Sequence, residues 1–428
     1  MKNLMIKKRV GVRALPITLA VILALVLSLG SLTAVFADDP EVDATAALTK
    51  VFEMAEGTTT PEAEFTFDIT TASENVPTDI PSVNDVVVEY DSAVLGTTHQ
   101  GLKTVPLQSG NIFAGVNFPH AGIYIYDIAE EESGYTIDQD TETLTYSDAS
   151  YKVKVYVEQK QSGTGTYIKA IESFKTTDDA GTSTDPQDPT GGKVDPTPGT
   201  PDPEPEDPLN GLSSMTFTNV YVKNTGGGGP PSGSNTVLSA SKTVIDGGDE
   251  AKYFPFTVKV TKPATIDDTP TYKGYVMEGG SVVTSASNGA IVLAAGQPNN
   301  YINFVSGTDT TVKLKHGQSL VFTEIEVGAT YVATESAQLN YNTSIELTAD
   351  DVVSNLGEVL TTGAARGVTE GTDLAAFTNA YDEVTPTGVV IDNLPYLGLI
   401  ALAIAALAVY LAAKRRRRIR EAMATERS

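Results

Sequence analysis

The chain has 428 residues, no cysteine and a formal net charge of −25, so disulfide bonds and thiol chemistry are excluded. Residues 38–387, between the two chain ends, contain 17 basic and 51 acidic side chains, a net charge of −34. Such an acidic surface repels polyanions, which excludes nucleic acid as a partner.

The N-terminus has the composition of a secretion signal. Residues 2–13 include five basic side chains, and the apolar stretch "LPITLAVILALVLSLGSLTAV" follows them. The small residues in "VFA", just before Asp38, are typical of a signal-peptidase cleavage site. We therefore predict that residues 1–37 are a signal peptide that directs export, rather than a membrane-retained helix.

Between its ends the chain has the pattern of an all-β protein. Segments such as "EFTFDITT", "YKVKVYVEQ" and "YFPFTVKVT" alternate apolar and polar residues between clusters of Gly, Pro, Asn and Asp. Many short strands of this kind predict β-sandwiches. We expect two tandem domains, at 40–223 and 236–382, joined by the Gly/Pro-rich linker 224–235.

Residues 176–211 form a Pro/Asp/Gly/Thr-rich tract that has too few apolar side chains to fold, so we expect disorder. The tract is either a linker or a long loop inside the first domain. We favour the loop, because the strand that contains "FTNVY" at 217–221 follows it. Without that strand the first domain would lack the counterpart of "FTNAY" at 377–381, which closes the second.

The two halves repeat one arrangement of polar residues. Each has a Lys on its first strand, a Tyr-x-x-x-Glu in mid-domain and Phe-Thr-Asn-x-Tyr on its last strand. Because alternate residues of a strand share a face, these Lys, Glu and Asn side chains fall on the apolar side of their strands. The residues are Lys50, Glu130 and Asn219, then Lys242, Glu335 and Asn379.

Burial of these groups favours formation of a Lys–Asn isopeptide bond. Burial lowers the pKa of an amine and raises that of a carboxyl group, so the amine can attack as a neutral nucleophile. A protonated Glu could donate a hydrogen bond to the Asn carbonyl oxygen and transfer protons as ammonia leaves. Glu131 or Glu132 could replace Glu130 as the catalyst, although Glu131 has the wrong strand parity.

The C-terminus resembles the cell-wall sorting signal of Gram-positive surface proteins. Residues 383–428 contain "EVTPTG", an apolar span at 394–413 and the basic run "KRRRRIR". The span is long enough to cross a bilayer, and the basic run would hold its end in the cytoplasm. The resemblance implies sortase cleavage between Thr387 and Gly388, although Pro386 directly precedes Thr387, unlike the common Leu-Pro-x-Thr-Gly form. The alternative is a plain single-span anchor.

The ordered Lys, Tyr-x-x-x-Glu and Phe-Thr-Asn-x-Tyr motifs resemble the isopeptide-containing domains of Gram-positive backbone pilins, in particular two-domain major pilins of group A streptococci. The resemblance covers nearly all of 40–428. It implies two immunoglobulin-like sandwiches with self-formed Lys–Asn crosslinks, with Glu130 and Glu335 as catalysts. It also implies a wall-anchored pilus subunit that a sortase joins to neighbouring subunits or to peptidoglycan.

Polymerisation also needs an intermolecular lysine, for which Lys175, Lys193 and Lys223 are candidates. The alternative function is a monomeric surface adhesin that binds a host or matrix ligand. We expect no cofactor and no metal site, because the three histidines lack zinc-ligand spacing. No nucleophile elbow or phosphate-binding loop occurs, so we do not expect a turnover enzyme.

Overall fold

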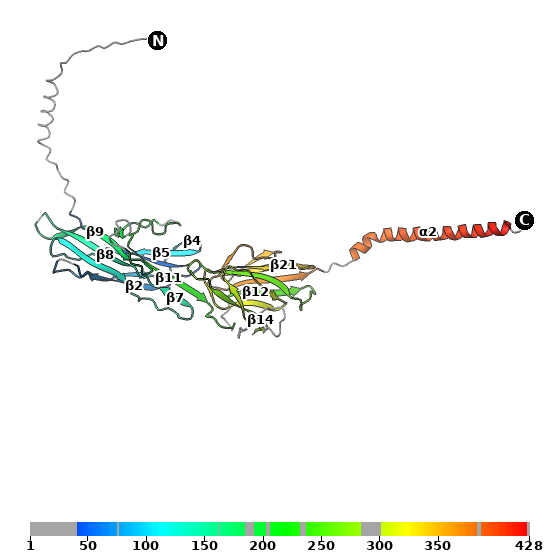
Figure 1. Ribbon diagram of the computed structural model, residues 1–428, viewed down its shortest axis with the longest axis horizontal. Coiled ribbons are helices and arrows are strands. Elements are labelled where there is room, and N and C mark those ends of the chain that lie inside the picture. Colours follow the sequence, from blue (N-terminus) through cyan, green and yellow to red (C-terminus); the bar gives the residue numbers. More distant parts are fainter. Residues whose placement is uncertain are drawn as a thin grey trace, which may run out of the picture.

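The computed structural model describes residues 41–74, 77–161, 163–184, 192–202, 206–231, 237–283, 301–382 and 387–425. Its strands form two β-sandwich domains, arranged end to end in Figure 1. We call them domain 1 and domain 2, after the ranges expected from the sequence. The predicted signal peptide and residues 383–386 of the sorting motif lie outside the described residues.

Domain 1 consists of two facing sheets. Sheet 1 contains β4 (Thr97–His99), β5 (Leu102–Gln108), β1 (Thr49–Ala55), β11 (Thr216–Thr225) and β7 (Glu142–Thr145). Sheet 2 contains β10 (Lys193–Val194), β9 (Thr166–Thr177), β8 (Ser150–Gln159), β6 (Gly122–Glu130), β2 (Ala63–Thr71) and β3 (Val86–Tyr90). The expected all-β sandwich is therefore confirmed.

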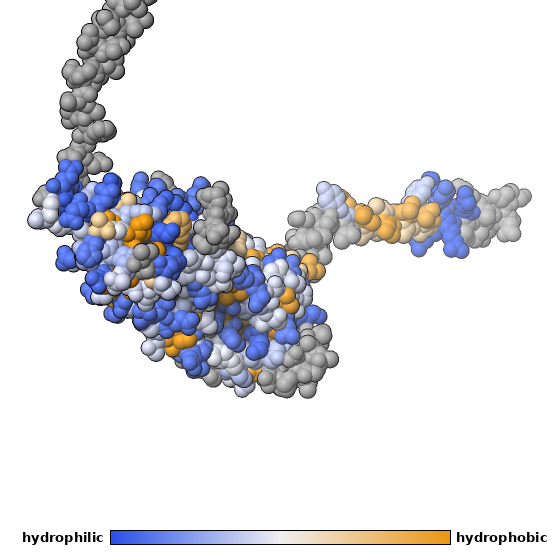
Figure 2. Space-filling model, turned by 60° about the vertical axis from the view of Figure 1, so that its left-hand side comes forward, coloured by the Kyte–Doolittle hydropathy of each residue, from blue (hydrophilic) through white to orange (hydrophobic). Residues whose placement is uncertain are grey.

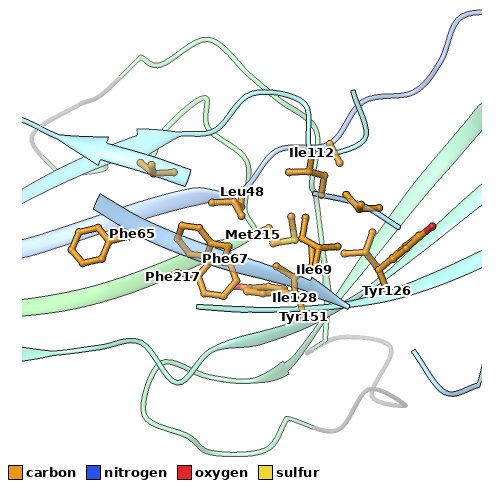
Figure 3. Close-up of a cluster of buried hydrophobic side chains, with 14 of the residues drawn as sticks. Leu48, Phe65, Phe67, Ile69, Ile112, Tyr126, Ile128, Tyr151, Met215 and Phe217 are labelled. Carbon is orange, nitrogen blue, oxygen red and sulfur yellow. The ribbon is translucent and has the colours of Figure 1, made fainter. Parts of the chain in front are cut away.

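Aromatic and aliphatic side chains from both sheets fill the core of domain 1. Figure 3 shows Phe67 of β2 beside Phe217 of β11, with Met215 and Tyr151 nearby. Their strands alternate buried and partly buried positions, as in β8 and β11, because successive side chains of a strand point to opposite faces. This alternation also directs the polar side chains of the candidate site into the core.

Domain 2 repeats the two-sheet plan. Sheet 3 contains β15 (Ser281–Val282), β14 (Thr271–Glu278), β18 (Gln318–Phe322), β12 (Leu238–Ile245), β24 (Asp373–Tyr381), β21 (Tyr341–Ala349), β22 (Val352–Gly357) and β16 (Tyr301–Val305), which pairs with β14. Sheet 4 contains β17 (Thr310–Leu314), β13 (Phe254–Thr261), β20 (Thr330–Glu335) and β23 (Arg366–Gly367).

In each domain the first strand lies parallel to the last strand and next to it. In domain 1, β1 pairs with β11, and in domain 2, β12 pairs with β24. A covalent bond between the two strands would therefore connect the beginning and the end of each domain within one sheet.

The last strand of domain 1 extends across the junction to domain 2. After Lys223, β11 continues to Thr225 and pairs with β19 (Ile325–Glu326) of domain 2. Residues 224 and 225 were expected to lie in the linker, but they are strand residues because β19 provides backbone partners for them.

The described parts of the Pro/Asp-rich tract begin at the end of β9, include β10 and end before β11 of domain 1. We expected this tract to be disordered, but residues 192–202 and 206–211 make defined backbone contacts in the structure. β10 pairs with β9, and the Pro196 carbonyl accepts a hydrogen bond from the Ala47 backbone. Backbone hydrogen bonds order this segment, and residue composition alone does not predict such bonds.

A long helix, α2 (Thr387–Thr425), forms the C-terminal part of the described chain. Residues Gly398–Arg418 are long and apolar enough to cross a membrane, and the expected span 394–413 overlaps this range. Figure 2 shows hydrophobic residues along α2, then a hydrophilic stretch, whereas the visible face of the domains is mostly hydrophilic. Thr387 and Gly388 are the first residues of α2.

Candidate functional site

The predicted nucleophile and amide of domain 1 lie on adjacent strands. Lys50 of β1 is opposite Phe217 of β11, and Asn219 is two residues further along β11. Side chains two residues apart on a strand share a face, so Lys50 and Asn219 are diagonal neighbours on the core face. Both residues are 0% exposed.

Glu130 reaches the same point from the facing sheet. Its Oε1 atom accepts hydrogen bonds from Lys50 Nζ at 2.8 Å and from Asn219 Nδ2 at 2.7 Å. Its Oε2 atom lies 2.7 Å from Lys50 Nζ, and both side chains of this ion pair are fully buried. One carboxylate oxygen therefore contacts the nucleophilic nitrogen and the nitrogen that would leave as ammonia.

Domain 2 has the same arrangement. Lys242 is opposite Phe377, and Asn379 lies two residues further along β24. Glu335 of β20 accepts hydrogen bonds from Lys242 Nζ at 2.9 Å and from Asn379 Nδ2 at 2.6 Å. Here the two nitrogens bind different carboxylate oxygens. The structure thus brings together all six residues predicted from the sequence.

Aromatic rings enclose both sites in equivalent positions. The amine of Lys50 lies 4.6 Å from the ring centre of Phe65, and that of Lys242 lies 4.4 Å from Phe254. The next inward Phe of each strand packs against the Phe of the Phe-Thr-Asn-x-Tyr motif, with ring centres about 5 Å apart. These pairs are Phe67–Phe217 at 4.8 Å and Phe256–Phe377 at 5.0 Å.

Burial changes the ionisation of both pairs in the expected directions. Burial lowers the pKa of Lys50 and of Lys242 to about 8, against the opposing effect of the neighbouring carboxylate. Burial also raises the pKa of Glu130 and of Glu335. Desolvation therefore favours transfer of a proton from the ammonium to the carboxylate, which leaves a neutral amine.

The orientation of the amide differs from our expectation. We expected a protonated Glu to bind the Asn carbonyl oxygen, but in both domains the amide nitrogen donates to the carboxylate. In domain 1 the backbone N–H of Ser147 donates to Asn219 Oδ1 at 2.8 Å, which directs Nδ2 toward Glu130. Sequence reasoning missed Ser147, because a backbone donor leaves no signal in residue type.

The alternative catalysts in domain 1 lie away from the amine. Glu131 accepts a hydrogen bond from the Ser133 hydroxyl, and Glu132 is exposed. The strand parity that favoured Glu130 over Glu131 agrees with this geometry.

The three candidate intermolecular lysines differ in accessibility. The side chain of Lys193 is 57% exposed and pairs with Glu172. That of Lys175 is 19% exposed and lies 3.7 Å from Asp179. Lys223 is 31% exposed, at the domain junction, and it pairs with Glu370 of domain 2 at 3.1 Å.

Comparison with known families gives a match for each domain. Residues 46–222 match the model of the Spy0128-like isopeptide containing domain, FctA. Domain 1 is therefore similar to the Spy0128-like isopeptide containing domains. The match confirms the resemblance to Gram-positive pilins that the sequence motifs predicted. Residues 236–381 match a domain family of unknown function, DUF7601, so the equivalent site in domain 2 lies in a domain without an assigned role.

Solved structures similar to the chain include pilus proteins. The major pilin of Streptococcus pyogenes is 20% identical over 79% of this chain and 99% of its own, with a TM-score of 0.32. The S. pyogenes major pilin T3.2 is 18% identical over 80% and 100%, with a TM-score of 0.30. A pilus-presented adhesin, Spy0125 (Cpa), is 12% identical over 79% and 100%, with a TM-score of 0.24. No curated protein matches the chain.

Proposed function

We propose that the chain is a pilus backbone subunit of a Gram-positive bacterium, stabilised by self-formed Lys50–Asn219 and Lys242–Asn379 isopeptide bonds. The observation that carries this proposal is the repeated site. In both domains a buried carboxylate from the facing sheet contacts a buried amine and a buried amide on parallel first and last strands.

In domain 1 the reaction begins with transfer of a proton from the Lys50 ammonium to Glu130. The neutral amine then attacks the side-chain carbonyl carbon of Asn219, and the carbonyl electrons move to Oδ1. Glu130 protonates Nδ2 and takes a proton from the Lys50 nitrogen, and the C–N bond breaks to release ammonia. The fixed positions of the three groups supply the effective concentration that this condensation needs. Lys242, Glu335 and Asn379 do the same in domain 2.

Each bond would connect the first and last strands of its domain, so a pulling force along the chain would act on a covalent link. By analogy with disulfides, closing loops of this length stabilises each domain by about 5 kcal/mol. The chain has no cysteine, and isopeptide bonds would supply the covalent crosslinks that an exported fibre requires.

Polymerisation would follow from sortase cleavage after Thr387 and transfer of its carbonyl to a lysine of the next subunit or to the cell wall. Among the three candidate lysines we favour Lys193. It is the most exposed of them, and it lies on the edge strand β10. Lys223 is disfavoured because its side chain is only 31% exposed and lies at the domain junction, where it contacts Glu370 of domain 2.

Mass spectrometry of the purified full chain tests the crosslinks. Each bond releases one ammonia, about 17 Da, so we expect the wild type to lack two ammonias relative to its sequence mass. Lys50→Ala and Lys242→Ala should each lack one, and the double variant none. Lys103→Ala is the matched control, because Lys103 is a half-buried lysine on the neighbouring strand β5, and it should still lack two. A wild type with the full sequence mass would refute the proposal.

Wall extracts of cells that produce the chain with its sortase test polymerisation. We expect a ladder of high-molecular-weight species that Thr387→Ala abolishes. Lys193→Arg should also abolish the ladder but leave single subunits attached to the wall, because a guanidinium is not an acyl acceptor. Lys175→Arg is the control. Loss of the ladder in Lys175→Arg but not in Lys193→Arg would reassign the linking lysine, and absence of a ladder in the wild type would favour a singly anchored adhesin.

A further inference from the structure

Domain 1 has a backbone hydrogen-bond donor at its reacting amide. Residues 146–149 carry the chain from β7 in sheet 1 to β8 in sheet 2, so this segment crosses between the sheets next to β11. Ser147 is 5% exposed, and its N–H lies 2.8 Å from Asn219 Oδ1. This N–H is directed at the oxygen on which negative charge would develop during amine attack.

Asp179 holds this donor and the reacting strand together. Its Oδ1 atom accepts hydrogen bonds from the Ser147 hydroxyl at 2.6 Å and from the Thr218 backbone N–H at 2.7 Å. Thr218 directly precedes Asn219 on β11. The Ser147 hydroxyl also accepts a hydrogen bond from the Ala149 backbone at 3.1 Å. One carboxylate thus fixes the distance between the Ser147 N–H and the amide of Asn219.

Domain 2 lacks this device among the residues that the structure describes. The strand next to β24 is β21, which continues in register past the reacting residue, with Thr343 opposite Asn379. Among the described residues, no segment crosses between the sheets at this position, so the β21–β24 pairing is continuous and directs no backbone N–H toward the core. Asn379 Oδ1 is buried and has no hydrogen-bond partner in the described part of the chain.

We propose that the Ser147 backbone N–H is the oxyanion donor of the Lys50–Asn219 condensation, that Asp179 is its positioning residue, and that domain 1 therefore crosslinks faster than domain 2. The inference rests on the proposed isopeptide chemistry. The N–H binds Oδ1 while Glu130 moves the protons, so the two groups act on opposite ends of the amide. Removal of one oxyanion donor typically slows acyl transfer by roughly 100- to 1,000-fold.

The rates are measured in the full chain as it is synthesised. Cells that produce the protein receive a pulse of labelled amino acids, and samples are quenched in acid at intervals. After proteolysis, the crosslinked peptides of each domain are quantified by mass spectrometry. In the wild type we expect the Lys50–Asn219 peptides to accumulate at least about tenfold faster than the Lys242–Asn379 peptides.

Variants distinguish the effect of the Ser147 N–H from the effect of the side chains that position it. Ser147→Pro removes the N–H and the hydroxyl, whereas Ser147→Ala removes only the hydroxyl, so we expect proline to slow domain 1 roughly 100-fold and alanine much less. Asp179→Ala should slow domain 1, and Asp179→Asn should recover most of the rate because its amide oxygen still accepts both hydrogen bonds. Asp178→Ala is the control, since Asp178 binds the backbone of Ala180 and Thr182 instead.

The rate in domain 2 is an internal reference for every variant. Equal rates in the two wild-type domains, or an Asp179→Ala rate equal to that of Asp178→Ala, would overturn the oxyanion proposal and leave the crosslinks intact. If Asp179→Asn were as slow as Asp179→Ala, charge and not positioning would be responsible, which also contradicts it. Absence of both crosslinks in the wild type would instead refute the proposed function. If Ser147→Pro does not fold, the Asp179 series still decides.

Discussion

At the scale of single residues, Glu130 is the group that connects the nucleophile to the leaving group. Glu130→Gln keeps the size and burial of the side chain but cannot accept a proton from Lys50. We expect this variant to fold and to retain the ammonia of domain 1, while domain 2 still loses its own. The readout is intact mass. Glu131→Gln is the matched control, because Glu131 binds Ser133 away from the site, and it should lack two ammonias relative to its own sequence mass, as the wild type does. Loss of both ammonias from Glu130→Gln would contradict the role of Glu130.

The ionisation of the Lys50–Glu130 pair predicts a bell-shaped pH dependence of crosslinking. The reactive state, with a neutral amine and a protonated carboxyl, holds the same number of protons as the ion pair. The rate should fall in acid, below the raised pKa of Glu130, because both groups are then protonated. It should also fall in alkali, above the Lys50 pKa of about 8, because no acid remains to protonate the leaving nitrogen.

This profile can be measured on chains that are collected in urea directly after synthesis and then refolded at different pH values. Crosslinked peptides are quantified against time at each pH. Glu335 and Lys242 have shifts of the same direction, with Lys242 also at about 8, so domain 2 should show a similar alkaline limb. A rate that continued to rise well above pH 8 would mean that proton donation by the carboxyl group is not required.

At the scale of strands, the sequence predicted which side chains enter the core but not every contact that they make there. Parity along a strand is local, so the inward positions of Lys50, Glu130 and Asn219 could be predicted from alternation alone. The parallel pairing of β1 with β11 joins segments far apart in the chain, and only the repeated motifs indicated it. Ser147 acts through its backbone N–H, for which no residue type is diagnostic.

The same limit explains why composition did not predict the backbone pairing of residues 192–202 in the Pro/Asp-rich tract. Composition measures how much apolar surface a segment can bury, and this tract has little. Residues 192–202 are ordered instead by backbone pairing, such as that between Pro196 and Ala47. Such pairing depends on strands elsewhere in the sandwich that present free backbone groups.

At the scale of the whole molecule, the two domains meet through contacts that leave little room for rearrangement. β11 pairs with β19 across the junction, and Glu370 of domain 2 accepts a hydrogen bond from the Thr59 backbone of domain 1 at 2.9 Å. Gly328, just after β19, has φ +82°, and a Cβ atom there would lie 2.4 Å from Ala55 Cβ. Ala55 is the last residue of β1, which also carries Lys50.

Gly328→Ala should therefore push the domains apart. Alanine strains the left-handed backbone and clashes with domain 1, whereas Gly280→Ala, at φ +79°, strains the backbone with nothing within 4 Å of the new Cβ. We expect small-angle X-ray scattering to give a changed interdomain arrangement for Gly328→Ala and a wild-type curve for Gly280→Ala. Both should lose two ammonias, since each crosslink lies within one domain. Identical curves for the two variants would mean that close packing at Gly328 does not set the junction. Because each proposed crosslink lies within one domain, only non-covalent contacts such as the β11–β19 pairing fix the orientation of the domains. Under load we therefore expect the subunit to bend at the domain junction.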